Sequence, residues 1–297
     1  MRFRRLKDLV ASRFMLSATI FSALLVVLIA VGLFQKSRPI LAMKPLGELL
    51  FSSSWRPWSG EFGFYPFIMG SLWVTAVAMV IAIPLCLLAS IYIAEYAPSR
   101  IRGVIKPLID LLAGIPSVVY GLWGVLLIVP FVRDIASFFG GTTNGYNVLA
   151  GGIVLAVMVF PVIISISEEV IRTVPHDMRE ASLALGATRW QATKLVVTRA
   201  ALPGIIAAII LGFGRAFGET IAVLMVVGNV ARVPSSVMDP AYPLTALIAN
   251  NYGEMMSVPL YDAALLFAAL VLLVVVFLFS VGARLILLRV ERSYAIG

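Results

Sequence analysis

The chain has 297 residues, of which 61% are hydrophobic and only 13% are charged, and its mean hydropathy is +1.02. This composition excludes a water-soluble globule and indicates a polytopic membrane protein in contact with lipid. The formal net charge of +8 does not indicate nucleic-acid binding, because the basic residues lie at the ends of apolar runs and not on one soluble domain. The single cysteine, Cys86, lies inside an apolar run and excludes a disulfide within the chain.

The first two apolar runs predict two membrane-spanning helices. A basic head at residues 1–13 precedes an uninterrupted run from about Phe14 to Phe34, which is longer than the apolar part of a typical signal peptide. We therefore expect an uncleaved first helix, and a signal peptide is the alternative. Residues 36–66 are rich in proline and aromatic residues, which favours a surface loop with a short interfacial helix near Leu46 to Phe51. A second span is expected from about Phe67 to Tyr96.

The third apolar stretch contains residues that interrupt helices. It follows a short basic turn at residues 97–106, is expected from about Pro107 to Val132, and includes the sequence GIPSVVYG at 114–121. Ser117 and Tyr120 place hydroxyl groups at membrane depth within this sequence. Backbone breaks at such a depth are tolerated only where neighbouring protein or water satisfies the freed groups. The segment is therefore either a packing kink or part of a transport pathway.

Three further runs complete a predicted set of six spans. We expect the fourth from about Val148 to Ile166, the fifth from Ala201 to about Gly228, and the sixth from about Tyr261 to Leu288. If successive loops alternate between the two sides of the membrane, one side holds 16 Lys and Arg residues and the other holds 6. By the positive-inside rule, both termini and the segment between the fourth and fifth spans face the cytoplasm.

Residues 171–203, between the fourth and fifth spans, form a polar island. Asp177 followed by Glu180 is a helix-start signal, and Gly186 stands where a left-handed C-terminal cap belongs. Thr188 then opens a second capping box, which predicts a second short helix. The island is expected to be a helix-turn-helix at the membrane surface, and it is either an ordinary interfacial loop or a docking element.

Arg215 and Glu219 lie within the fifth apolar run. They are four residues apart, which would place both on one face of a continuous helix, and Arg215 would lie roughly 18 Å into the span. Gly214 and Gly218 leave room for close helix approach or for a solute. Charges at this depth are costly, so the two residues form either a structural ion pair or a site for an oxyanion, in which Glu219 neutralises and orients Arg215.

Motifs for catalysis are missing from the sequence. The Gly-rich stretch GFGRAFGET at 212–220 has the wrong spacing for an ATP-binding loop and contains no lysine, and the one histidine, His176, is expected to be a solvated polar residue. We therefore expect a non-enzymatic permease without cofactor or metal, powered by partner proteins. A secondary transporter would instead need a matching pair of broken helices, and only one broken span is visible. A membrane scaffold would need no buried ion pair in its spans.

Four passages resemble a known family. They are GIPSVVYGLWG, FPVIISISEEVIRTVP, REASLALGATRW and ALPGIIAAIILGFGRAFGETIAVLMVVGN. Together they resemble the permease subunits of the phosphate-specific ABC importer, and the ending MVVGN is similar to the PstC type and not to the PstA type. The likeness implies the type I (MetI-like) permease fold in a prokaryotic inner membrane. It also implies a PstA-like second permease subunit, two PstB-like cytoplasmic ATP-binding subunits and an external PstS-like phosphate-binding protein.

The resemblance also implies roles for single residues. The candidate ATPase-coupling residues, which are similar to the E-A-A-x-x-x-G signature of the coupling loop, are Glu180, Ala181, Ser182 and Gly186. The candidate pathway residues are Arg215, Glu219, Ser117 and Tyr120. In the family, the Arg and Glu that match are the intramembrane charges implicated in phosphate passage. Two features depart from the coupling-loop pattern: Ser182 replaces the second Ala, and Leu202-Pro203 comes four residues late.

The chain is expected to divide into three parts. Residues 1–66 hold the cytoplasmic head, the first span and an external loop; residues 67–290 hold the permease core, with the coupling loop at about 171–202; and residues 291–297 form a short cytoplasmic tail. The residues alone do not separate phosphate from another oxyanion such as molybdate or sulfate.

Overall fold

Six helices long and apolar enough to cross a membrane occur in the computed structural model, which describes residues 2–254 and 258–295. The six are Leu9–Met43, Tyr65–Tyr96, Ser117–Phe138, Val148–Thr173, Arg189–Gly218 and Tyr261–Arg289. Most of these described residues are helical, and the one sheet among them has two short strands. The predicted all-α membrane fold with six spans is therefore confirmed.

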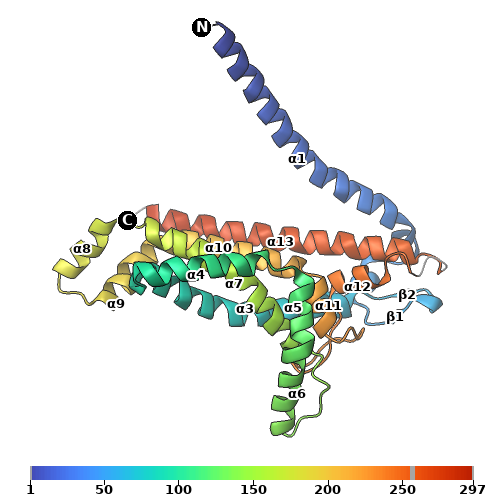
Figure 1. Cartoon of the computed structure of the whole chain (residues 1–297). Coiled ribbons are helices and arrows are strands. Elements are labelled where there is room, and N and C mark those ends of the chain that lie inside the picture. Colours follow the sequence, from blue (N-terminus) through green and yellow to red (C-terminus); the bar gives the residue numbers. More distant parts are fainter. Residues whose placement is uncertain (1, 255–257, 296–297) are drawn as a thin grey trace.

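The first helix, α1 (Arg2–Met43), leaves the bundle at a steep angle (Figure 1). Among its described side chains, those that are buried, such as Ser37 and Ile40, lie near its end, where it meets α13 (Tyr261–Ala295). The short helix α2 (Leu46–Phe51) follows, at the residues where the sequence predicts it.

The loop after α2 forms a small core of aromatic rings. Strands β1 (Trp55–Arg56) and β2 (Glu61–Phe62) are antiparallel and are joined by the 3₁₀ turn η1 (Pro57–Ser59). The ring centroid of Trp55 lies 4.8 Å from that of Phe67 and 6.2 Å from that of Tyr261. Trp55 thus packs against the buried Phe67 and against Tyr261 of α13, in contacts that remove apolar surface from water.

Helices α3 (Tyr65–Ile91), α7 (Val148–Thr173), α10 (Thr198–Gly218) and α13 make the bundle. The wide π-type turn η2 (Tyr92–Tyr96) continues α3 to the end of the second span. Glycines let the helices approach closely: a Cβ on Gly212 of α10 would lie 2.5 Å from the Ile163 side chain of α7. The second, fourth and sixth spans match their predictions, with ends extended by a few residues.

The third span starts later than the sequence predicts. Residues expected to form a basic turn and the start of the span instead form one amphipathic helix, α4 (Ser99–Gly114), which has no buried residue. The chain then breaks at Ile115, whose extended backbone (ψ 129) is the conformation that the following proline favours. The span is built from α5 (Ser117–Trp123), the π-type turn η3 (Gly124–Ile128) and α6 (Val129–Phe138), and it turns away from the bundle (Figure 1).

Both predicted ends of the fifth span are wrong. The span begins at α9 (Arg189–Ala192), which runs without a break through the π-type turn η4 (Thr193–Val197) into α10. It ends at Gly218, since Glu219 is extended (ψ 134), and a separate short helix α11 (Ile221–Val226) follows. The chain then passes through a loop and α12 (Leu244–Asn251) to α13.

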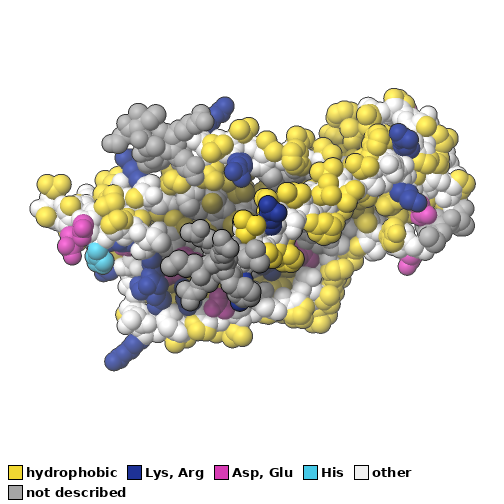
Figure 2. Space-filling view, turned by 90° about the horizontal axis from the view of Figure 1, so that it is seen from above, with side chains coloured by type: hydrophobic (Ala, Val, Ile, Leu, Met, Phe, Trp, Pro, Cys, Tyr) yellow, Lys and Arg dark blue, Asp and Glu magenta, His cyan; other side chains and the backbone are white. Residues whose placement is uncertain are grey.

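Figure 2 shows hydrophobic side chains over much of the face seen there, as a surface in contact with lipid or with another subunit requires. Acidic, basic and histidine side chains gather at the end that carries the short helix α8 (His176–Ala184).

Candidate functional site

The polar island forms a hairpin of α8 and α9 that projects from one end of the bundle (Figure 1). Gly186 closes α8 with φ +84, and its N–H donates to the Leu183 carbonyl at 2.9 Å. The Ala187 N–H donates to the Ser182 carbonyl at 3.2 Å. These two bonds and the left-handed glycine make a Schellman cap, so the predicted end of the first helix is confirmed.

One of the two predicted capping boxes is present. The Gln191 N–H donates to the Thr188 hydroxyl at 3.3 Å, and the Thr188 N–H donates to the Gln191 side chain at 2.8 Å. The box predicted at Asp177 and Glu180 is wrong, because the N-cap of α8 is Pro175, two residues before Asp177, and Asp177 lies inside the first turn. A carboxylate in that turn still interacts favourably with the helix dipole.

The outer surface of the hairpin is open to a partner. Glu180 is 75% exposed, Ala181 is exposed and Ser182 is half-buried. Large apolar side chains are exposed beside them: Leu183, Leu185 and Trp190. His176 is 82% exposed and lies 3.9 Å from Glu180, as a solvated histidine does. A surface of this kind, mixing one carboxylate with exposed apolar groups, is typical of a protein-docking site.

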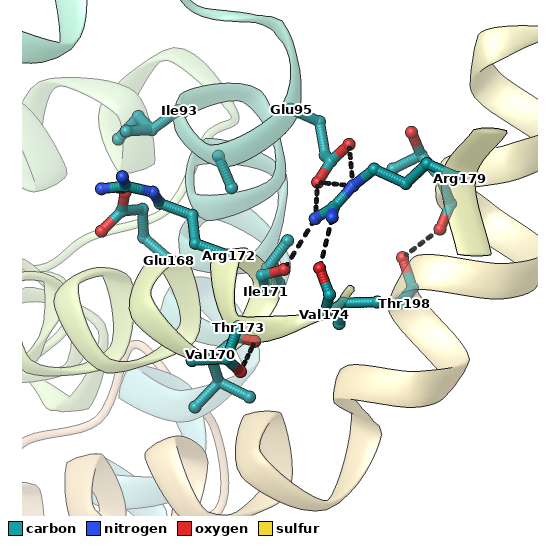
Figure 3. A network of polar contacts seen from close by, with 12 residues as sticks. Ile93, Glu95, Glu168, Val170, Ile171, Arg172, Thr173, Val174, Arg179 and Thr198 are labelled. Carbon is teal, nitrogen blue, oxygen red and sulfur yellow. Dashed lines mark hydrogen bonds and ion pairs between the residues drawn. The ribbon is translucent and has the colours of Figure 1, made fainter. Parts of the chain in front are cut away.

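The inner side of the hairpin is held by Arg179 (Figure 3). Its guanidinium donates to both carboxylate oxygens of Glu95, with a shortest distance of 2.7 Å, and these side chains are only 14% and 10% exposed. It also donates to the Ile171 carbonyl at 3.0 Å and to the Val174 carbonyl. One side chain of α8 thus joins the end of the second span to the end of α7.

A second arginine of the hairpin reaches the same turn. Arg189 donates to the Glu95 carbonyl, and its guanidinium lies 4.8 Å from the centroid of the Tyr96 ring. A cavity of about 560 Å³ lies between the hairpin and the turn η2. Sequence reasoning missed Glu95, because its partner is 84 residues away and no local pattern connects the two.

In the membrane, Arg215 and Glu219 do not form the expected pair. The prediction that they share one helical face is wrong, because α10 ends between them. The Glu219 carboxylate accepts from the Ala222 N–H at 3.2 Å, at the start of α11, and the Glu219 carbonyl accepts from the Thr245 hydroxyl at 3.0 Å. Within the described residues, no ion pair includes either charge.

Arg215 lies on a face of α10 that the rest of the chain leaves uncovered. It is exposed, and a Cβ on Gly214 or Gly218 would meet nothing within 4 Å. Among the described residues, the small-residue pair therefore makes no close helix approach. Its position beside a charge in the last turn of α10 leaves space for another subunit or for a solute.

The break before α5 is held by a buried tyrosine. The Tyr120 hydroxyl donates to the Leu112 carbonyl at 2.8 Å. This hydrogen bond gives a partner to the Leu112 carbonyl, which receives no helical bond from Pro116. Backbone groups at a break at membrane depth require such partners. Ser117, the first residue of α5, is half-buried. In the described part of the chain, no group of three or more His, Cys, Asp or Glu residues could hold a metal ion.

Comparison with known proteins places this architecture in a family. The probable ABC transporter permease protein YqgH of Bacillus subtilis is 43% identical over 239 residues, which cover 80% of this chain and 76% of that protein. The phosphate transport system permease protein PstC of Xylella fastidiosa is 36% identical over 292 residues, covering 93% and 89%. The inward-facing MetNI methionine ABC transporter has the same fold, with a TM-score of 0.58 and 19% identity over 76% of this chain and 97% of that chain. Residues 86–292 match the family of binding-protein-dependent transport system inner membrane components, and the chain belongs to that family.

Proposed function

We propose that the chain is the permease subunit of an ATP-driven phosphate importer and forms the translocation pathway with a second permease subunit. The relatives named as phosphate permeases match almost the full length of the chain, which supports phosphate as the solute. The observation that carries the proposal within the molecule is Arg215, a cation on an uncovered face of a membrane-spanning helix.

A phosphate ion needs a compensating charge to cross a layer of low dielectric constant. The planar donors of Arg215 suit its oxygens. Tyr120 and Ser117 lie on the helix that follows the break in the third span. The Glu219 carboxylate accepts a backbone hydrogen bond and so holds the chain where α10 ends. In this proposal Arg215 binds the ion, while the other three residues shape the path beside it.

The energy of ATP hydrolysis reaches the permease at a second site, the hairpin of α8 and α9. Glu180, Ala181 and Ser182 meet a cytoplasmic ATP-binding subunit, and Gly186 sets the turn that presents them. Two such ATP-binding subunits, one for each permease subunit, supply the hydrolysis. An external phosphate-binding protein delivers the ion at the end of the bundle opposite to the hairpin.

This arrangement requires the hairpin and both termini to be cytoplasmic, in the inner membrane of a prokaryote. The loops at 36–66 and 229–260 then lie outside. Single cysteines at the exposed positions Ser53 and Ser236, in a Cys86→Ala background, should react with an impermeant thiol reagent added to intact cells. Labelling that needs membrane disruption would overturn this topology.

The central test uses the purified permease complex in liposomes with ATP inside. Phosphate, delivered by the binding protein, should stimulate ATP hydrolysis and enter the liposomes, whereas sulfate and molybdate should not. Arg215→Gln should abolish uptake and leave assembly intact. Arg133→Gln is the matched control, because Arg133 is exposed and, among the described residues, its guanidinium pairs with the neighbouring Asp134 alone. Normal uptake by the Arg215→Gln complex would remove Arg215 from the pathway, and selective stimulation by another oxyanion would reassign the solute.

A further inference from the structure

The last turn of the second span, η2 (Tyr92–Tyr96), is bound by side chains from three helices. From α8, Arg179 makes a bidentate pair with Glu95, and from α9, Arg189 binds the Glu95 carbonyl and covers the Tyr96 ring. From α4, Arg102 donates to three carbonyls of the same region at 3.1, 3.1 and 3.3 Å. The turn is therefore fixed to both helices of the hairpin.

The pair of Arg179 and Glu95 differs from the exposed ion pair on the hairpin, that of His176 and Glu180. Its side chains are 14% and 10% exposed, and the planar fork of the guanidinium engages both carboxylate oxygens. His176 and Glu180, by contrast, are 82% and 75% exposed and 3.9 Å apart. Exposed pairs contribute little, whereas removing one member of a buried pair leaves a charge without compensation.

The chain path explains what this pair adds. The hairpin is joined covalently to α7 at one end and to α10 at the other, since α9 continues into α10. Helix α3 has no such covalent connection to the hairpin, although it packs along α7 in the largest core of the bundle. Arg179 and Glu95 supply a bidentate side-chain connection between α8 and the turn that continues α3, beside the contacts that Arg189 makes from α9.

We propose that Arg179 and Glu95 are the positioning pair that transmits movement of the docked hairpin to α3, and that they set how much solute moves for each ATP hydrolysed. The inference rests on the proposed function, because it needs an ATP-binding subunit on the hairpin. When that subunit displaces α8, the bidentate pair carries η2 and α3 with it, so three helices of the bundle move together. Without the pair, α8 has lost its side-chain link to this turn, the contacts of Arg189 alone join the hairpin to η2, and less of the movement reaches α3.

The test compares the number of phosphate ions transported for each ATP hydrolysed, in liposomes that contain the complete complex. Arg179→Gln and Glu95→Gln should still assemble and hydrolyse ATP, and the ratio should fall by roughly 5-fold to 150-fold, the usual range of coupling between two sites. Arg179→Lys, which keeps the charge but loses the fork, should lower the ratio less. The double variant Arg179→Glu and Glu95→Arg exchanges the two charges and should recover part of the lost ratio.

Arg172→Gln is the matched control. Arg172 also lies at this end of α7; its side chain is 48% exposed, and its buried partner Glu168 keeps Lys106 at 3.5 Å when Arg172 is replaced, so the ratio should not change. Transport and hydrolysis that fall together, in proportion to the amount of assembled complex, would show that the pair only stabilises the fold. An unchanged ratio in Arg179→Lys and in both Gln variants would also overturn the proposal. If the complex moves another oxyanion in place of phosphate, the ratio is measured with that ion, so the two proposals fail separately.

Discussion

Replacing Gly186 tests whether the coupling hairpin depends on a left-handed backbone. Its φ of +84 is a conformation that L-residues with a side chain adopt at a cost, and a Cβ at this position would meet nothing within 4 Å. A substitution therefore strains the backbone without causing a steric clash. The strain should be smallest for Asn, which tolerates this region, larger for Ala, and about 1 to 3 kcal/mol for the β-branched Val.

A strain of that size shifts the balance between the correctly formed and the distorted hairpin by roughly 5-fold to 150-fold. We expect Gly186→Val to reduce both copurification of the ATP-binding subunit and phosphate uptake, at equal amounts of the permease in the membrane. Gly186→Ala should have an intermediate effect, and Gly186→Asn should be closest to the unchanged protein.

Gly140 offers a matched control for the same strain. It also has a positive φ, +76, and open space at its Cβ, but it lies in the loop after α6, outside the hairpin. Gly140→Val should therefore leave binding of the ATP-binding subunit unchanged. Equal losses in Gly140→Val and Gly186→Val, or normal uptake by Gly186→Val, would refute the reasoning.

Two further predictions concern packing and pH. A Cβ at Gly204 would collide with Val170 of α7, whereas a Cβ at Gly214 meets nothing within 4 Å. Gly204→Ala should therefore reduce the free energy of unfolding by about 1 to 3 kcal/mol and lower the melting temperature of the purified subunit, and Gly214→Ala should not. Equal melting temperatures of the two variants would contradict this. In the loop after α11, hydrogen bonds from the Ser235 side chain and backbone lower the pKa of Asp239 below the ordinary value of 3.8 for a carboxyl group. The ionised carboxylate should therefore keep this turn ordered as the pH falls to about 3.8, and the order should be lost only at lower pH. Hydrogen exchange of the Ser235 amide measures this, and Asp239→Asn should remove the pH dependence.

Local features of the fold could be predicted from the sequence because their causes are local. The turn at Gly186 and the capping box at Thr188 depend on residues within one helical turn of each other, and both occur where predicted. The spans could be predicted because a long apolar run must be buried or face lipid. The same reasoning misplaces the start of the third span, since α4 is apolar on one face only and continues the hydropathy of the span before the break at Ile115.

The candidate site depends on distant contacts, which sequence patterns do not contain. Glu95 and Arg179 are 84 residues apart and meet only because α3 packs along α7. The spacing of Arg215 and Glu219 suggested an ion pair, but the pattern assumed a continuous helix. The Glu219 carboxylate instead accepts from the Ala222 N–H at the start of α11, and the Thr245 hydroxyl of α12 donates to the Glu219 carbonyl, so the helix can end inside an apolar run.

This geometry changes what Glu219 is expected to do. Its carboxylate oxygen accepts from the Ala222 N–H at 3.2 Å and so caps the start of α11, next to the charge of Arg215 at the end of α10. Loss of a capping acceptor costs about 0.5 to 2 kcal/mol. Glu219→Gln keeps an oxygen that can accept this bond and loses the charge, whereas Glu219→Ala loses both.

If Glu219 acts by holding the chain break that presents Arg215, Glu219→Ala should reduce phosphate uptake more than Glu219→Gln does. The comparison is made in liposomes with the complete complex, at equal amounts of assembled permease. A role as the charge partner of Arg215 predicts a different order, because both substitutions remove the negative charge. Equal loss of uptake in the two variants would therefore restore the ion-pair interpretation, while a smaller loss in Glu219→Gln assigns Glu219 to the backbone that positions the cation.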